Sequence, residues 1–164
     1  MAMMKKSAST KAHCEQMPLF PKEESPYYKC FVFNEAKDVG DVPLVKFTTL
    51  VAFIFNGQVF NLRTWTNDFL MSVCDVLHKW NSSRLYDAVR NNARLIRPFY
   101  RERIATLDNP VLHKSSGIWI ERTMDANASL KGVWNLCKEC GAPMERIVVI
   151  YEVNPKKASK SKLG

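Results

Sequence analysis

Apolar residues follow strand-like and helix-like periods between residues 45 and 153. The segment 45–55 is almost continuously apolar after Thr49, which is typical of a strand that is buried on both faces. Asn56 and Gly57 follow, and because both residues accept a positive φ they predict a tight hairpin turn. The predicted return strand contains Val59, Phe60 and Leu62.

Two helical periods follow the hairpin. Thr64 is the predicted cap of the first helix, and Asp68 would complement the helix dipole in its first turn. Apolar residues then recur every three or four positions, which predicts an amphipathic helix packed on the hairpin. Residues 81–83 (Asn-Ser-Ser) are predicted to end this helix and to cap a second one, whose inward side chains include Leu85 and Val89.

The remaining pattern predicts a short strand, a helix and a final strand. Residues 117–121 alternate between apolar and other side chains, and residues 146–153 are rich in β-branched ones, so both segments are predicted strands. We expect the second of them to lie beside the hairpin. Asp125 or Asn127 is the predicted cap of a helix over residues 129–140.

These elements predict one layered α+β domain over residues 27–153, with the order β-β-α-α-β-α-β. Residues 27–33 are aromatic and β-branched, and would form a further strand or an ordered arm. Residues 1–26 lack a period and contain three prolines, so we expect a disordered arm, and residues 154–164 are expected to form a basic disordered tail. No apolar run is long enough to cross a bilayer, and no signal peptide is apparent, so we expect a cytoplasmic protein without a membrane partner.

The net positive charge of the chain indicates the chemical class of its binding partner. The 24 Lys and Arg residues exceed the 16 Asp and Glu residues, and the formal charge of +8 favours an anionic partner, of which nucleic acid is the commonest. Arginines concentrate over residues 84–103, and their guanidinium groups bind phosphates, while aromatic rings stack on unpaired bases. The predicted DNA- or RNA-binding residues are Arg90, Arg94, Arg97, Phe99, Tyr100, Arg101 and Arg103, with Lys156 and Lys157 of the tail. The alternative is a solvated helix face whose arginines pair with acids and whose aromatic residues are core.

The arm contains Gln16-Met17-Pro18-Leu19-Phe20, which resembles the peptide by which many bacterial replication and repair proteins dock on the DNA sliding clamp. The resemblance implies that Gln16 makes polar contacts and that Leu19 and Phe20 fill an apolar pocket of a protein partner. Pro18 departs from the commoner Ser or Asp. The alternative is that Leu19 and Phe20 fold back onto the domain.

A second resemblance covers about residues 45 to 153. A Gly-x-x-Phe hairpin (Gly57, Phe60), Trp65 with an amphipathic helix, and the segment 117–121 before Ser129 resemble a pattern in small prokaryotic domains of uncertain function. The resemblance implies a shared fold and a prokaryotic or phage source, and it implies no active site.

The cysteines have two interpretations. Five cysteines at irregular spacing predict free thiols, because no disulfide framework is apparent. Cys137 and Cys140 form a C-x-x-C pair that Cys74 and His78 could complete as a zinc site. Apolar helical positions favour core cysteines instead, so we expect neither metal nor cofactor.

Catalysis is not predicted. The three histidines, at positions 13, 78 and 113, have no sequence partner that indicates a triad, and Glu121, Asp125 and Glu152 are explained as caps or strand ends. No glycine-rich phosphate loop is present. The sequence therefore favours a non-enzymatic nucleic-acid-binding protein. The alternative is an interaction or regulatory subunit of a larger complex, whose basic surface and exposed aromatic residues meet another protein.

Overall fold

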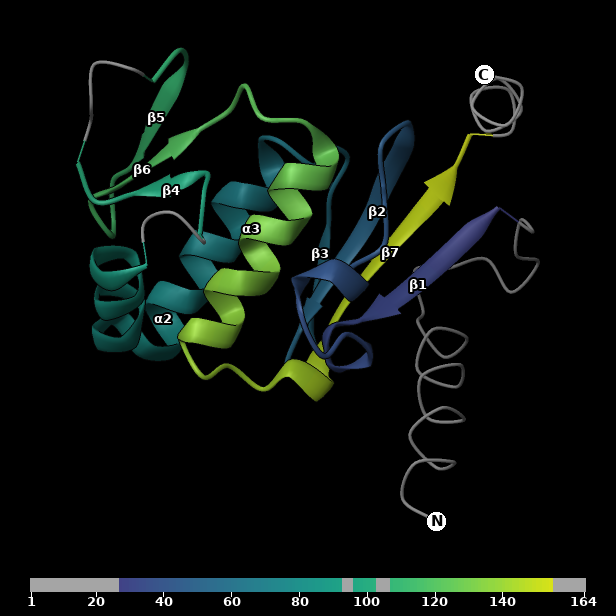
Figure 1. Ribbon diagram of the computed structural model, residues 1–164, viewed down its shortest axis with the longest axis horizontal. Helices are drawn as coiled ribbons and strands as arrows, with labels where there is room; N and C mark the ends of the chain where they lie inside the picture. Colours follow the sequence, from purple (N-terminus) through teal and green to yellow (C-terminus); the bar gives the residue numbers. More distant parts are fainter. Residues whose placement is uncertain (1–26, 93–95, 103–106, 155–164) are drawn as a thin grey trace.

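The computed structural model places the described strands in two antiparallel sheets and packs two helices between them (Figure 1). It describes residues 27–92, 96–102 and 107–154. The α+β class predicted from the sequence is therefore confirmed. Several predicted binding residues lie outside the described ranges, namely Gln16, Leu19, Phe20, Arg94, Arg103, Lys156 and Lys157.

The larger sheet has four strands in the order β1-β7-β2-β3, and every neighbouring pair is antiparallel. Its strands are β1 (Tyr28–Val32), β7 (Ile147–Val153), β2 (Thr48–Phe55) and β3 (Gln58–Asn61). The last strand of the chain lies in the interior of the sheet, where Val149 is opposite both Phe31 and Phe53. The predicted position of the final strand beside the hairpin is thus confirmed.

The predicted hairpin is also confirmed. Phe55 pairs with Gln58, and Asn56 and Gly57 between them have φ values of +50° and +88°. The strand begins at Thr48 instead of residue 45, because Phe47 has a φ of +67° and turns the chain before the sheet.

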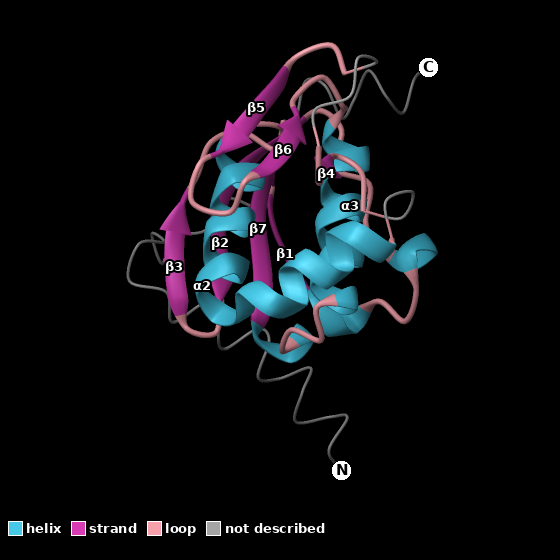
Figure 2. Cartoon of the chain, turned by 90° about the vertical axis from the view of Figure 1, so that its left-hand side faces the viewer, coloured by secondary structure: helices cyan, strands magenta, loops and turns pink. Residues whose placement is uncertain are grey.

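The two faces of this sheet carry separate apolar clusters. Phe53 of β2 belongs to the main core with the helices, which cover one face (Figure 2). Ile54 belongs to a smaller cluster on the other face, whose buried members in the described residues all come from strands, namely Val32, Ala52, Ile54, Val148 and Ile150. The prediction that residues 45–55 include a strand buried on both faces is correct for residues 50–55, whereas Thr49 is exposed.

Helix α2 (Asp68–Asn91) joins the two predicted helices into one kinked element. The predicted cap was Thr64, but the cap residue of α2 is Asn67. The hydroxyl of Thr64 still accepts a hydrogen bond from the backbone N–H of Asp68 at 2.9 Å. Asn81 leaves helical geometry (φ −162°, ψ 89°), and its side chain accepts from the N–H of Arg84 at 3.1 Å. Asn81 therefore caps the second half of the helix across the kink.

No helix in the described ranges is long and apolar enough to span a membrane.

Helix α3 (Ala126–Glu139) begins earlier than the periodicity indicated. Asp125 is its cap, because its carboxylate accepts from the N–H of Ala128 at 2.8 Å. The side chains predicted to face inward are fully buried, among them Leu130, Val133 and Cys137. The described residues also form three single-turn 3-10 helices, at Phe33–Glu35, Val39–Asp41 and Met144–Arg146.

The second sheet departs from the predicted element order. It has three strands in the order β4-β6-β5, namely β4 (Phe99–Tyr100), β6 (Ile118–Glu121) and β5 (Pro110–His113). Only the strand at β6 was predicted, because β4 has two residues and β5 begins with Pro110, which was assigned to a turn. Phe99, Ile118 and Ile120 belong to the same buried core as the four-stranded sheet and the helices.

Four cysteines lie in the described residues. Cys74, Cys137 and Cys140 are free and fully buried, and burial raises the pKa of Cys74 to about 11 and that of Cys140 to about 12. Cys30 is disulfide-bonded, so the prediction of free thiols is wrong at this position. Cys14, the remaining cysteine, lies outside the described residues.

Candidate anion-binding pocket

A pocket of about 250 Å³ lies between the second half of α2 and the turn that joins β5 to β6. Helix α2 contributes three residues, the end of β4 contributes one, and the β5–β6 turn with the start of β6 contributes three. The lining residues are Tyr86, Val89, Arg90, Arg101, Ser116, Gly117 and Ile118. Segments that are distant in the sequence thus meet at this pocket.

Buried neighbours fix the direction of both arginines. On α2, Val89 is 3% exposed and packs in the core, so the adjacent Arg90 lies at the surface. Tyr86 precedes Arg90 by one helical turn and therefore shares its face. Arg101 follows β4, where Phe99 is fully buried, so the chain emerges from the core just before this arginine.

The opposite wall is a tight turn. The backbone N–H groups of Ser116 and Gly117 both donate to the carbonyl of His113, at 3.2 and 2.8 Å. Gly117 has a φ of +75°, a conformation that glycine adopts without steric cost. The turn therefore presents a wall with no side chain at position 117.

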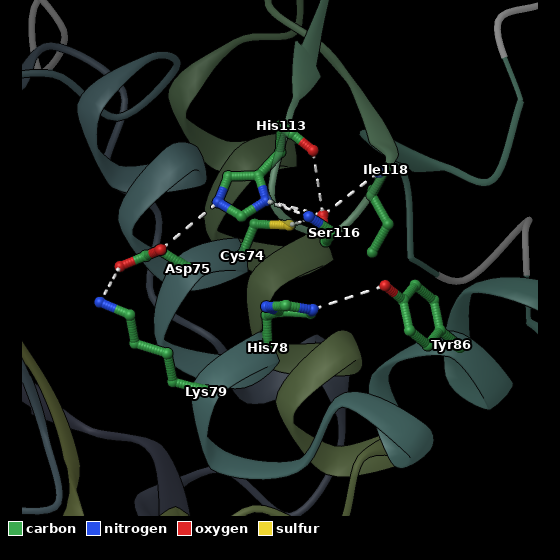
Figure 3. Close-up of polar contacts among 8 residues, drawn as sticks. All are labelled: Cys74, Asp75, His78, Lys79, Tyr86, His113, Ser116 and Ile118. Carbon is green, nitrogen blue, oxygen red and sulfur yellow. Dashed lines mark hydrogen bonds and ion pairs between the residues drawn. The ribbon is translucent and has the colours of Figure 1, made fainter.

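A buried polar network supports this wall (Figure 3). The backbone N–H of Ser116 donates to Nδ1 of His113 at 3.3 Å, which identifies this nitrogen as an acceptor. The hydroxyl of Ser116 then donates to the same nitrogen at 2.6 Å and accepts from the N–H of Ile118 at 3.2 Å. The protonated Nε2 of His113 faces Asp75 at 3.6 Å, and Asp75 also pairs with Lys79 at 3.1 Å.

Electrostatics keep His113 neutral. Burial lowers the pKa of His113 below its usual value, and His78 and Lys79 act in the same direction, whereas Asp75 opposes the shift. The imidazole is only 5% exposed, so it is shielded from water behind the turn. A neutral His113 can accept the Ser116 proton, as the hydrogen-bond geometry requires.

The order Ser116–His113–Asp75 is that of a hydrolase triad. In this chain, however, the serine and the histidine belong to one turn, and the hydroxyl also accepts the N–H of Ile118. Ser116 is 6% exposed, and its sulfur neighbour, the Cys74 thiol, lies 3.4 Å away. The geometry therefore supports a network that fixes the pocket wall.

Tyr86 lines the pocket, and the residue is 42% exposed. Its hydroxyl lies 3.4 Å from Nε2 of His78, and the two rings meet edge to face at 6.0 Å (Figure 3). The contact with His78 orients the phenol while ring surface stays accessible. Tyr86 is thus an aromatic group available for stacking.

The predicted arginine cluster divides in the structure. Arg90 and Arg101 meet at the pocket, whereas Arg97 is exposed but does not line it. Tyr100 is half-buried in β4. Phe99 is fully buried, so the prediction that its ring stacks on bases is wrong, because the ring has no exposed surface.

Sequence reasoning missed the rest of the pocket. Tyr86 was not singled out, although it lies one helical turn from Arg90. Ser116 was missed as a partner of His113, and the spacing His-x-x-Ser-Gly before a strand is the pattern that could have indicated their shared turn.

Glu121 has a structural role that agrees with its predicted assignment to a strand end. Its carboxylate accepts from the backbone N–H groups of Asp108, Asn109 and Thr123 at 2.7, 3.0 and 3.2 Å. Burial alone raises its pKa, but these hydrogen bonds outweigh burial and lower it. Glu121 therefore fastens the loop before β5 to the end of β6.

The alternative of a zinc site gains no support from the geometry. Within the residues that the structure describes, no group of three or more His, Cys, Asp or Glu side chains could hold a metal ion. Cys137 and Cys140 pack in the main core.

Comparisons of the chain with protein-family models, with curated proteins and with solved structures find no match. The resemblances to small prokaryotic domains and to the clamp-binding peptide stay predictions. Since a fold alone does not define a function, function is inferred from the side chains of the pocket.

Proposed function

We propose that this protein binds nucleic acid without catalysing a reaction, through a surface centred on Arg90 and Arg101. The observation that carries this proposal is the meeting of these two arginines at one pocket beside the exposed ring of Tyr86. Guanidinium groups bind phosphate oxygens in pairs, and an exposed aromatic ring stacks on unpaired bases. Tyr86 thus takes the stacking role that was predicted for Phe99.

The remaining charge extends this surface. The exposed Arg97 precedes β4, and Arg101 follows the same strand. The formal charge of +8 adds long-range attraction for a polyanion. Lys156 and Lys157 of the tail are proposed to add phosphate contacts. Single-stranded DNA or RNA fits best, because only unpaired bases expose their faces to Tyr86.

The test is an anisotropy titration of a labelled single-stranded oligonucleotide at about 50 mM and about 200 mM salt. We expect the affinity to fall with salt, with a slope of about −0.7 per neutralised phosphate. The variant Arg90→Ala/Arg101→Ala should bind at least about tenfold more weakly and with a shallower slope.

The control variant is Arg63→Ala/Lys29→Ala, which removes the same charge from exposed positions near the four-stranded sheet. Equal losses in both variants would show that binding depends on net charge and not on the pocket. The absence of binding by the wild-type protein at low salt would contradict the proposal itself.

A second candidate function is association with a protein partner through the loop formed by residues 44–47, called the 44–47 loop. Leu44 is 72% exposed and Phe47 is 51% exposed, so the loop presents two large apolar side chains to solvent. Phe47 has a φ of +67°, which is rare for a bulky residue and costs free energy. Backbone strain of this kind often marks functional sites.

The rest of the fold holds the 44–47 loop in this shape. The side-chain oxygen of Asn127 accepts from the N–H groups of Val45 and Lys46 at 2.6 and 2.9 Å. The hydroxyl of Thr48 donates to the carbonyl of Val45 and accepts from the indole N–H of Trp65 at 3.0 Å. A loop that is ordered before binding loses less conformational entropy, which favours a partner with a matching apolar pocket.

This second function is tested by affinity capture from the native host with three baits. The wild-type protein and Arg90→Ala/Arg101→Ala should retain a stoichiometric, nuclease-resistant protein, and Leu44→Ser/Phe47→Ser should lose it. Capture of the same protein by all three baits, or its release by nuclease, would exclude the 44–47 loop as the interface.

A further inference from the structure

The size of the pocket restricts what it can hold. Its volume of about 250 Å³ lies below the range of about 300 to 1,000 Å³ that is usual for small-molecule sites. One phosphate group is small enough to enter such a space. A phosphate at the end of a strand can enter a concave site more readily than one inside a continuous backbone.

We propose that the pocket binds the terminal phosphate monoester of a nucleic-acid strand. This inference rests on the proposed nucleic-acid-binding function and names the part of the ligand that the pocket recognises. The chemistry is that of a phosphate monoester, whether it lies at the 5′ or the 3′ end.

The charge of the pocket matches a monoester. Of the lining residues, Arg90 and Arg101 carry formal charge, and both are positive. A phosphate monoester carries a charge of about −1.5 to −2 near neutral pH, whereas an internal phosphodiester carries one negative charge. Two guanidinium groups therefore balance the charge of a terminal phosphate, whereas one guanidinium group is enough to balance an internal phosphate.

The wall opposite the arginines leaves room for the phosphate. A Cβ atom built on Gly117 would have no neighbour within 4 Å, so the space beside this residue is open. The proton of the Ser116 hydroxyl is directed to His113, and His113 is neutral, so the wall adds no negative charge. The wall thus supplies shape, and the arginines supply the attraction.

Tyr86 provides the second reason to favour a strand end. An internal base stacks on neighbours on both faces, but the terminal base has one free face. Tyr86 is 42% exposed and lines the same pocket as Arg90. A terminal nucleotide can place its phosphate between the arginines and its free base face against Tyr86.

The experiment compares three single-stranded oligonucleotides of about ten nucleotides, a length within the site sizes of such proteins. They share one sequence and one internal fluorophore, and carry a 5′-phosphate, a 3′-phosphate or no terminal phosphate. We expect one phosphorylated oligonucleotide to bind at least about tenfold more tightly than the unphosphorylated one. The end that gives this advantage identifies the source of the phosphate.

Variants test whether the tighter binding of the phosphorylated oligonucleotide depends on the pocket. Arg90→Ala/Arg101→Ala should abolish it, and Arg101→Lys should reduce it, because Lys keeps the charge but loses bidentate geometry. Arg63→Ala/Lys29→Ala should preserve it. Thermal melting of each variant establishes that it is folded before binding is compared.

The two proposals fail in different ways. Equal affinity for all three oligonucleotides would overturn the terminal-phosphate inference and leave nucleic-acid binding intact. An advantage that survives in Arg90→Ala/Arg101→Ala would overturn the assignment to this pocket. If no oligonucleotide binds at low salt, both proposals are wrong.

Discussion

The pocket wall and the 44–47 loop are two turns that side chains hold in place by bonding to backbone groups, but they differ in what they expose. The wall hides its polar network, because His113 and Ser116 are 5% and 6% exposed. The 44–47 loop hides the backbone of Val45 and exposes the apolar side chains of Leu44 and Phe47. The first turn shapes a concave charged site, and the second presents an apolar projection.

The two turns also differ in the range of the contacts that hold them. The bonds between His113 and Ser116 join residues three apart, so the wall carries its own support. The bond from Val45 to Asn127 spans 82 residues, so the 44–47 loop depends on the position of α3. Substitutions in α3 should therefore disturb the 44–47 loop more than they disturb the pocket wall.

The largest expected effect is that of Gly132→Ala, which disturbs both surfaces. A Cβ atom at this position would lie 1.7 Å from the carbonyl oxygen of Arg97 and 2.9 Å from Pro98. Either α3 or the segment leading to Arg101 must move, and we expect a loss of about 3 kcal/mol in the free energy of unfolding. Urea unfolding measures the loss. Lys131→Ala on the same helix is the control, with an expected change within about 0.5 kcal/mol.

The next effect separates the two surfaces. Asn127→Ala removes the acceptor of two backbone N–H groups and should cost about 2 kcal/mol of unfolding free energy. Asn127→Asp keeps an acceptor oxygen and should restore most of that stability. Oligonucleotide binding under native conditions should stay unchanged in both variants. Weaker binding in Asn127→Ala alone would show that the loop and the pocket are coupled.

A smaller effect measures the strain at Phe47. Phe47→Gly and Phe47→Ala both remove the ring, but only glycine adopts a φ of +67° without steric cost. The glycine variant should therefore be more stable than the alanine variant by about 0.5 to 1 kcal/mol, after allowing for the greater entropy of unfolded glycine. Thermal and urea unfolding of the pair measure this difference. Equal or reversed stabilities would mean that the loop relaxes when the ring is absent.

The smallest expected effect concerns pH and the wall alone. Burial lowers the pKa of His113 from its usual value of 6.5, so the folded protein resists the proton that the unfolded chain accepts. The contribution of His113 to stability is therefore complete above about pH 6.5 and declines as the pH falls below it. When the pH is lowered from about 7.5 to about 5.5, the melting temperature of the wild-type protein should decrease. The decrease should be smaller in His113→Gln. Identical slopes would exclude His113 as the titrating group.

Features that depend on local bonds were predictable from the sequence. The Asn56-Gly57 turn, the break at Asn81 and the cap at Asp125 each involve a side chain or glycine acting on nearby backbone. The strand β4, in contrast, is two residues long, and β5 begins with Pro110, so neither shows a strand period. These strands form because β6 pairs with both of them.

The candidate site was predictable only in part. Arginine enrichment indicated Arg90 and Arg101, since charge is visible in the composition. The burial of Phe99 and the position of Tyr86 depend on how α2 packs against the second sheet, which no local pattern encodes. The 44–47 loop, in which Phe47 has a positive φ, is held by hydrogen bonds from the N–H groups of Val45 and Lys46 to Asn127 on α3, a distant segment.

The kink at Asn81 sets the helical phase of the pocket. Because the second half of α2 starts anew at this residue, the number of residues between the kink and Arg90 determines which way Tyr86 and Arg90 point. One alanine inserted after Ser83 would rotate both side chains by about 100° around the helix axis, away from the β5–β6 turn. The same rotation would carry the buried Leu85, Ala88 and Val89 out of the core, so the insertion should destabilise the second half of α2 together with the pocket.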